Sequence, residues 1–139
     1  MKHYNIYNNT EEGLGQNTDP RGTITDAFYK CNMNHCAIIT NEPGAVRGNH
    51  YHKYTTQYTL VLTGSMTYYS KAVEPSDSPV ESILAVPGDM IISDANEIHT
   101  MQASSEGCTF IAFAEGVRGG KDYESDSFKV DSIIPGDTK

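Results

Sequence analysis

The chain has 139 residues, which is enough for one domain with a hydrophobic core. It carries 10 Lys and Arg residues against 18 Asp and Glu residues, and the formal net charge of −8 argues against a surface that binds nucleic acid or an anionic membrane. The N-terminal segment MKHYNIYNNTEEGLG lacks the apolar run of a secretory signal, and no segment approaches the roughly 18 apolar residues of a membrane span. We therefore expect a cytoplasmic protein that has neither a membrane nor a nucleic acid as its partner.

Short β-branched or aromatic runs, each closed by Gly, Pro, Asn or Asp, alternate with polar loops along the chain. These runs predict strands at 37–41, 57–64, 65–73, 81–88, 90–93 and 108–116. Polar connections are expected at 74–79 and 116–127, and a final edge strand in IIPGDTK at 133–139. No helical apolar period, repeat or linker interrupts this pattern. Short strands at this spacing predict an all-β sandwich or barrel, formed by a single domain over residues 1–139.

The three cysteines are Cys31, Cys36 and Cys108. Their number is odd and none lies in a CxxC pair, so neither a disulfide framework nor a zinc knuckle is indicated. We expect all three to be reduced and structural.

Two histidines separated by one residue precede an apolar, β-branched run. Gly44 is followed after five residues by His50-x-His52, after four more by Gln57 and after six more by Gly64. These intervals match the first motif of the cupin family, in which Glu is usual at the position of Gln57.

A second set of intervals lies further along the chain. Gly88, Asp94, Asn96 and His99 follow one another with five, one and two residues between them. The spacing matches the second cupin motif, with Asp94 and Asn96 in place of its usual Pro and Gly. The closing Asn of that motif is Ala103 here.

With these two motifs, at 44–64 and 88–103, the chain resembles a single-domain cupin. The resemblance implies an all-β jelly-roll barrel, also called a double-stranded β-helix. Such barrels leave strand edges that a partner's strand often caps, so we expect a homodimer.

Strand geometry indicates what the motif histidines can do. Residues i and i+2 of a strand point to the same face, so His50 and His52 both project inward if that face is the barrel interior. Gln57 on the next strand and His99 on another can then converge with them. Three imidazole nitrogens and one oxygen suit Fe, Mn, Ni, Co or Zn and leave positions for water or substrate. We expect a divalent transition metal at these four residues.

Gln57 changes the expected strength of such a site. A carboxylate would cancel one charge of a divalent ion, whereas an amide supplies only a dipolar oxygen, so the metal would be held less tightly. Two alternatives stay open: histidines that act on or bind a ligand without metal, and histidines with a purely structural role.

A narrower resemblance concerns the flanks of the first motif. DPRGTITDAF at 19–28 and RGNHYHK at 47–53 look like segments of the cupins that act on nucleotide-linked sugars, the dTDP-4-keto-sugar epimerases and ketoisomerases. In the epimerases the first segment lies against the nucleotide, and the second carries a phosphate-binding Arg and a proton-abstracting His. The resemblance implies that Arg21 contacts the nucleotide, Arg47 binds the pyrophosphate and His50 is the base.

The ketoisomerase pattern is R-G-x-H-x-H-K followed by a Gln. It fits Arg47, His50, His52, Lys53 and Gln57, and thereby implies His50 and His52 as catalytic residues and Lys53 as a further substrate-binding residue.

The chemistry of such a site is removal of a proton α to a ketone and its return to another face or atom. Imidazole is a base of near-neutral pKa, and the developing enolate needs a donor or a cation nearby. That second role falls to His52, to Tyr68 or Tyr69, or to a metal. The segment GKDYESD at 120–126 is also similar to the Asp-Tyr-containing C-terminal region of the ketoisomerases.

The leading functional prediction is a metal-binding cupin that isomerises or epimerises a sugar or nucleotide-sugar. The first alternative is metal-dependent oxygen chemistry, because the same histidines on Fe(II) would leave positions for O₂ and substrate. The second is a non-catalytic module that binds a sugar or a metal.

Overall fold

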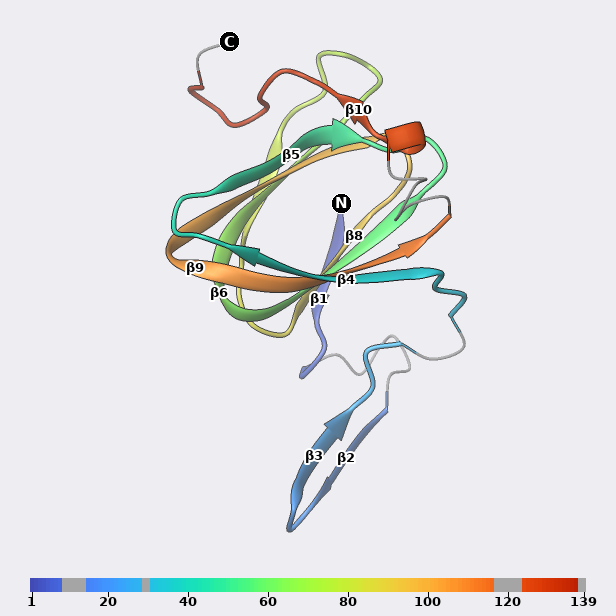
Figure 1. The fold of residues 1–139 in the computed structure, drawn as a ribbon, viewed down its shortest axis with the longest axis vertical. Coiled ribbons are helices and arrows are strands. Elements are labelled where there is room, and N and C mark those ends of the chain that lie inside the picture. The colour runs from blue at the N-terminus through green and yellow to red at the C-terminus, as the bar shows by residue number, and fades with distance from the viewer. Residues whose placement is uncertain (9–14, 29–30, 117–123, 138–139) are drawn as a thin grey trace.

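Two long antiparallel strands, β6 (Thr56–Ala72) and β9 (Glu97–Glu115), lie side by side through the whole barrel (Figure 1). The computed structural model describes residues 1–8, 15–28, 31–116 and 124–137. Each long strand pairs with one set of short strands along its first half and another set along its second half. The two strands therefore pass from one layer of the barrel to the other.

The first layer contains the beginning of β6 and the end of β9. Its order is β1 (Lys2–Asn5), β8 (Asp89–Ser93), β6, β9 and β4 (His35–Asn41), and every pair is antiparallel. Its two edge strands are β1 and β4.

The second layer contains the end of β6 and the beginning of β9. Its order is β7 (Glu81–Ala85), β6, β9, β5 (Val46–Tyr51) and β10 (Phe128–Lys129), again antiparallel throughout. A 3₁₀ turn at Glu124–Asp126 precedes β10.

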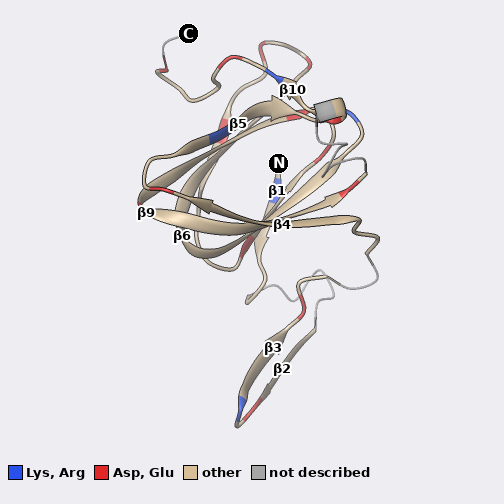
Figure 2. Ribbon diagram, in the orientation of Figure 1, with Lys and Arg blue, Asp and Glu red and all other residues tan. Residues whose placement is uncertain are grey.

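A separate hairpin of β2 (Gln16–Asp19) and β3 (Gly22–Thr25) projects away from the barrel (Figure 1). Acidic residues, red in Figure 2, lie mainly in loops and at strand ends, where charged side chains can stay in contact with water.

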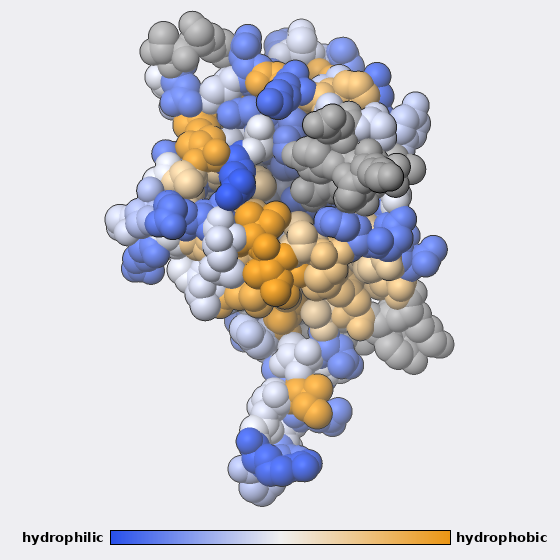
Figure 3. Space-filling model, in the orientation of Figure 1, coloured by the Kyte–Doolittle hydropathy of each residue, from blue (hydrophilic) through white to orange (hydrophobic). Residues whose placement is uncertain are grey.

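A large apolar cluster fills the part of the barrel interior away from the motif histidines. Its buried members are Val61, Met66, Tyr68, Ala85, Ile91, Met101, Ala103, Cys108, Phe110 and Ala112. On the outer face of the first layer, Phe28 packs edge-to-face on Tyr58 and Phe113, with ring centroids 5.4 and 4.5 Å apart. Apolar side chains also gather over β4 on the face seen in Figure 3, where Ile38 is 70% exposed.

The bend of β6 corrects the prediction of two strands at 57–64 and 65–73. β6 is continuous, with register shifts near Gly64 where it changes layers. Gly64 has φ +73°, and a Cβ atom there would overlap the carbonyl oxygen of Gly107 on β9. Glycine thus permits two backbones to approach at the bend, and a single bent strand replaces the expected break.

The other strand predictions fare unevenly. Those at 37–41, 81–88 and 90–93 correspond to β4, β7 and β8, and 74–79 is a loop. The prediction at 108–116 gives only the second half of β9, and the sequence pattern missed β1 and the projecting hairpin. The strand expected to carry both motif histidines is β5, which ends at Tyr51, so that it contains His50 but not His52.

The predicted final strand at 133–139 is wrong in its described part, which forms turns and bends. The edge of β5 pairs instead with Phe128–Lys129. Pro135 inside the predicted segment removes a ladder donor, so the earlier segment takes this edge.

Burial separates the cysteines, none of which forms a disulfide. Cys108 is buried, and burial raises the pKa of its thiol, whereas Cys31 and Cys36 are exposed. Of the three cysteines that were expected to be structural, only Cys108 is therefore buried in the protein.

Among the described residues, no helix has the length and apolar character needed to cross a membrane. The expected homodimer stays a prediction.

We expect Gly64→Ala to lower the free energy of unfolding by about 3 kcal/mol, because it combines a strained positive φ with overlap against the Gly107 backbone. Gly44→Ala is the matched control, since Gly44 has a similar φ of +76° but nothing within 4 Å of the added Cβ, and should cost only about 1 kcal/mol. Urea denaturation of both variants measures the difference. Equal losses of stability would show that the approach of the two strands does not constrain the bend.

Candidate active site

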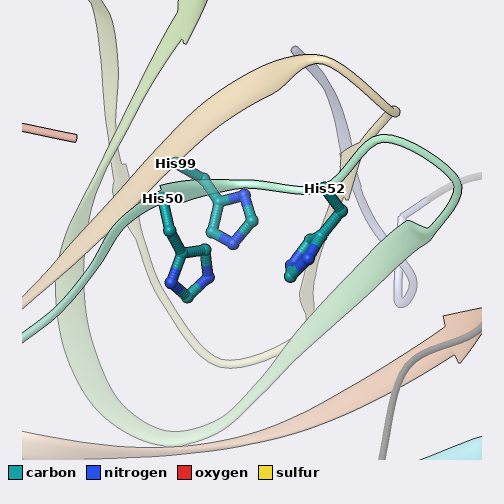
Figure 4. A group of neighbouring side chains, drawn as sticks. All are labelled: His50, His52 and His99. Carbon is teal, nitrogen blue, oxygen red and sulfur yellow. The ribbon is translucent and has the colours of Figure 1, made fainter. Parts of the chain in front are cut away.

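Three buried histidines from two neighbouring segments converge at one end of the barrel interior (Figure 4). The exposed fractions of His50, His52 and His99 are 8%, 2% and 1%. Their ligand-type nitrogens all lie within 4.8 Å of one another, and the ring centroids are 4.6 to 5.3 Å apart. The predicted convergence of the three motif histidines is therefore present in the structure.

A β-bulge in β5 controls how His50 meets His99. Gly48 pairs with Thr100 and His50 pairs with His99. Thr100 and His99 are consecutive on β9, so Asn49 is an extra residue of β5 that has no partner in this register. Asn49 has φ 53°, and its amide donates to the Thr100 hydroxyl at 3.1 Å. Asn is among the few residues that tolerate this backbone conformation, which makes it suited to the bulge.

The bulge also changes which side chains share a face. Arg47 lies opposite Met101, and His50 lies opposite His99, two residues away from Met101 on β9. Directly opposed residues share a face, so Arg47 and His50 both point to the interior side. Regular alternation would have placed residues three apart on opposite faces. The extra residue therefore brings a cation and an imidazole to the same side.

The C-terminal segment fixes the orientation of His52, which lies just beyond the end of β5. Its Nδ1 donates to the backbone carbonyl of Asp126 at 2.5 Å, since a carbonyl can only accept. Neutral His52 then carries its lone pair on Nε2, the state that a metal ligand or a base requires.

The side chain of Asp126 holds the loop that carries His52. It is 1% exposed and accepts from the backbone amides of Lys53 and Tyr54 and from the Thr55 hydroxyl, at 2.8, 3.1 and 2.8 Å. Burial alone would raise its pKa, but the hydrogen bonds from these donors, together with nearby His52, outweigh it and hold the pKa of Asp126 below its usual value.

Gln57 lies on the interior side of the next strand and is 1% exposed. Its Nε2 donates to the Thr59 hydroxyl at 3.1 Å, which directs the amide within the barrel. Both this residue and His50 line the cavity described below.

The two candidate tyrosines separate clearly. Tyr68 lies opposite Met101 on the interior face, is fully buried, and hydrogen-bonds the Ser93 hydroxyl. Its ring centroid is 6.3 Å from that of His99. Tyr69 is the next residue on the strand and faces the other side, so only Tyr68 adjoins the histidines.

A cavity of about 570 Å³ opens between β4 and β5 and reaches the histidine cluster at His50. This volume falls in the range of small-molecule sites. Its lining residues are Ile38, Ile39, Thr40, Val46, Arg47, Gly48, His50, Gln57, Met101, Phe110 and Lys129. The β4 side is mainly apolar, and the β5 side carries the polar and charged groups.

Of the three substrate-binding residues that the resemblance implies, one lines the cavity and two do not. Arg47 lines the cavity, where its Nε and Nη2 donate to Asn41 Oδ1 at 2.6 Å and to the Thr40 carbonyl at 3.1 Å. Lys53 lies outside the cavity lining, with its Nζ 4.4 Å from the centroid of the Phe128 ring. Arg21 lies at the tip of the projecting hairpin, paired with Asp19, and does not reach the site of its own chain.

Comparison with known structures identifies the fold. QdtA, a sugar 3,4-ketoisomerase from Thermoanaerobacterium thermosaccharolyticum solved in complex with TDP, gives a TM-score of 0.67 at 20% identity over 84% of each chain. NovW, a 4-keto-6-deoxy sugar epimerase from Streptomyces spheroides, gives 0.69 at 16% identity over 88% of this chain and 68% of NovW. The dTDP-4-dehydrorhamnose 3,5-epimerase from Bacillus anthracis, with TDP and PPi bound, gives 0.68 at 14% identity over 93% and 84%. The chain has the cupin fold.

The predicted all-β jelly-roll fold is thereby confirmed for this chain. The family model of the polysaccharide biosynthesis C-terminal domain matches residues 17–83, which include the first histidine motif and all of the projecting hairpin except Gln16. No curated protein sequence matches the chain.

The sequence analysis did not identify two residues of the site, Lys129 and Asp126. Lys129 enters the cavity from a two-residue strand that exists only through pairing with β5, and such a strand leaves no periodic signal. Asp126 lies in the segment 120–126 noted for its resemblance, but its contacts depend on tertiary packing. The Asp-Tyr pair of that segment, residues 122–123, falls outside the described residues.

We expect Asp126→Ala to lower the free energy of unfolding by roughly 2–4 kcal/mol at pH 7, because two partly buried backbone donors and the buried Thr55 hydroxyl lose their charged acceptor. A carboxyl whose folded pKa lies below its unfolded value, near 3.9, contributes stability that is complete above that value and is lost as pH falls through the folded pKa. The deficit of the variant should therefore shrink below about pH 4.

Chemical denaturation at pH 7 and at about pH 3 tests this dependence, with Asp77→Ala, in an exposed loop, as the control. If Asp126→Ala and Asp77→Ala are equally stable at pH 7, the carboxylate does not anchor the loop.

Proposed function

We propose that this cupin moves a proton next to the ketone of a nucleotide-linked keto-sugar, with His50 as the base. The observation that carries the proposal is the placement of His50 on the cavity wall beside Arg47, backed by His52 and His99. The sugar 3,4-ketoisomerase QdtA, which was solved with TDP, and the 3,5-epimerase of the same fold, which was solved with TDP and PPi, support this substrate class.

The proposed step begins with neutral His50. Its imidazole nitrogen takes a proton from the carbon adjacent to the ketone, and the C–H electron pair moves into the carbonyl group to give an enolate. The imidazolium then gives that proton to the former carbonyl carbon. The hydroxyl proton of the neighbouring carbon passes to the former carbonyl oxygen, and the ketone forms at the neighbouring carbon. Imidazole suits both directions because its ordinary pKa lies near neutrality.

The walls of the cavity favour isomerisation over epimerisation. Proton transfer between neighbouring carbons needs one base on one face, whereas inversion at one carbon needs an acid on the opposite face. Across the mouth from β5, the described lining residues are Ile38, Ile39, Thr40 and Phe110, none of which titrates near neutrality. The ketoisomerase reaction is therefore the function that this site supports best.

Arg47 would bind the phosphates of the substrate. Its hydrogen bonds to Asn41 and Thr40 hold the guanidinium in one orientation at the cavity, and a guanidinium matches phosphate oxygens as a planar donor.

The donor set also fits a divalent transition metal, which we propose as a resident cofactor. The ligand-type nitrogens of the three buried imidazoles lie within 4.8 Å of one another, and His52 has the hydrogen-bonded Nδ1 typical of ligating histidines. Gln57 would complete the set with its amide oxygen. A bound metal would act as a Lewis acid that stabilises negative charge on oxygen.

Metal-dependent oxygen chemistry remains a second candidate, favoured by the same three histidines. An Fe(II) ion with three imidazole ligands keeps positions for O₂ and a substrate. Oxygen uptake in the presence of Fe(II) distinguishes this function from proton transfer, which consumes no oxidant.

We expect protein expressed without a histidine tag to bind Co(II) or Zn(II), and His99→Ala to weaken that binding more than about tenfold. Gln57→Glu should strengthen it roughly tenfold, because a carboxylate cancels one charge of the ion. His3→Ala, on the exposed side of β1, is the control. Titration followed by elemental analysis measures the affinities, and a parent protein that binds neither ion contradicts the metal proposal.

We expect the protein to catalyse deuterium incorporation from heavy water into TDP-4-keto-6-deoxyglucose, the ligand seen with a variant of QdtA. His50→Asn should reduce the rate by about 10²–10⁴-fold because the base is lost. Arg47→Gln should act mainly by raising KM, since it removes a binding contact. Mass spectrometry of the sugar follows the exchange, and His3→Ala is again the control.

Absence of exchange with this and related keto-sugars would remove the proton-transfer proposal. Oxygen uptake by the same protein would then support the second candidate.

A further inference from the structure

Lys129 lies directly beside His50, although the two residues are far apart in the sequence. β10 pairs with β5 in a register that sets Lys129 opposite His50 and Phe128 opposite Tyr51. Directly opposed residues of an antiparallel pair share a face, so Lys129 points to the same side as His50. The amide of Val130 donates to the Asn49 carbonyl at 2.8 Å and extends this docking by one residue.

The bulge at Asn49 adds a second cation to that side. Arg47 precedes the bulge and shares the inward face of His50 because of it. Arg47 and Lys129 therefore lie on adjacent strands and line the same cavity, with His50 between β9 and β10. Figure 2 shows the basic residues of β5 and β10 in blue on neighbouring strands.

Neither cation is neutralised by a carboxylate within the described parts of the chain. The ion pairs found there join the N-terminal amine to Glu81 and Glu97, and Arg21 to Asp19. The hydrogen bonds that Arg47 makes to other described residues go to uncharged oxygens, those of Asn41 and Thr40. Two positive charges thus meet at one opening of a protein whose net charge is −8, an arrangement that concentrates attraction for an anion there.

The positions of the other lysines set Lys129 apart. Lys53, which the sequence pattern favoured, packs its ammonium on the Phe128 ring outside the cavity lining. Lys71 lies at the end of β6, in the second layer, and donates to the Ser76 carbonyl. It too is outside the lining of this cavity. Among the described lysines, Lys129 is the one that lines the mouth beside the histidines.

We propose that Lys129 and Arg47 together bind the diphosphate of the substrate at the cavity mouth, so that the C-terminal strand completes the substrate site. This inference rests on the proposed function for the identity of the anion. Two cations on adjacent strands match two linked phosphates better than a single phosphate or a carboxylate. The planar guanidinium supplies directed donors, and the ammonium supplies a mobile point charge.

The geometry also gives the diphosphate a positional role. An anion held between Arg47 and Lys129 is fixed at the rim, and His50 lies beside both residues on the cavity wall. The attached sugar would then extend inward toward the imidazole. Binding energy from the remote diphosphate would thereby place the reacting carbon at the base.

The test compares Lys129→Gln with Lys71→Gln, because each variant removes one positive charge from the end of a strand and alters the net charge equally. Isothermal titration with TDP and with inorganic pyrophosphate measures the affinities of the parent and both variants. We expect Lys129→Gln to weaken both ligands about tenfold and Lys71→Gln to leave them unchanged. Circular dichroism verifies that both variants are folded.

Salt provides a second readout. Raising the ionic strength from about 0.05 to 0.5 M screens exposed charges, so TDP binding by the parent should weaken more than binding by Lys129→Gln.

The outcomes separate this inference from the proposed function. If the parent binds TDP and Lys129→Gln binds it equally well, the inference is wrong and the proposed function stands. If pyrophosphate binding depends on Lys129 but TDP-4-keto-6-deoxyglucose undergoes no exchange, the anion site stands and the proposed function falls. If the parent binds neither TDP nor pyrophosphate, the diphosphate site is refuted directly.

Discussion

The pairing of β5 with β9 around the bulge at Asn49 is the constraint on which the whole site depends. A strand of regular alternation can direct either Arg47 or His50 inward, but not both. One extra residue resolves this conflict, and the Thr100 hydroxyl holds it by accepting from the Asn49 amide and donating to its side-chain oxygen at 2.7 Å. Gly48 is part of the same arrangement, because a Cβ there would overlap the His99 carbonyl oxygen. The bulge is therefore a means of aiming side chains.

The barrel can bury many polar groups because its interior has an apolar part and a separate polar end. Its apolar part, with Met66 and Phe110 fully buried, supplies the favourable transfer free energy. The other end holds the imidazoles and Gln57, whose placement is directed by hydrogen bonds such as His52 to the Asp126 carbonyl and Gln57 to Thr59. Buried polar groups that are held in this way keep a single orientation, which is what both a metal site and a proton-transfer site require.

The C-terminal segment acts on the site through two neighbouring features. Asp126 anchors the loop after β5 and orients His52, while Lys129 enters the cavity three residues later. Both contacts arise because this segment runs along the free edge of β5. The edge is thereby covered, which removes an unpaired row of backbone groups, and the same pairing brings a charge to the site.

The sequence by itself determined the all-β class, the cupin resemblance and the histidines, because glycine spacing and alternating strands are local properties of the chain. It did not determine the continuity of β6, since the bend at Gly64 depends on the approach of Gly107 from β9. It also did not determine the direction of Arg47, the anchoring by Asp126 or the entry of Lys129. Each of these follows from the register between strands distant in sequence. A residue's own neighbours fix its backbone preferences, but only the strand paired beside it decides which face it shares and which charge it meets.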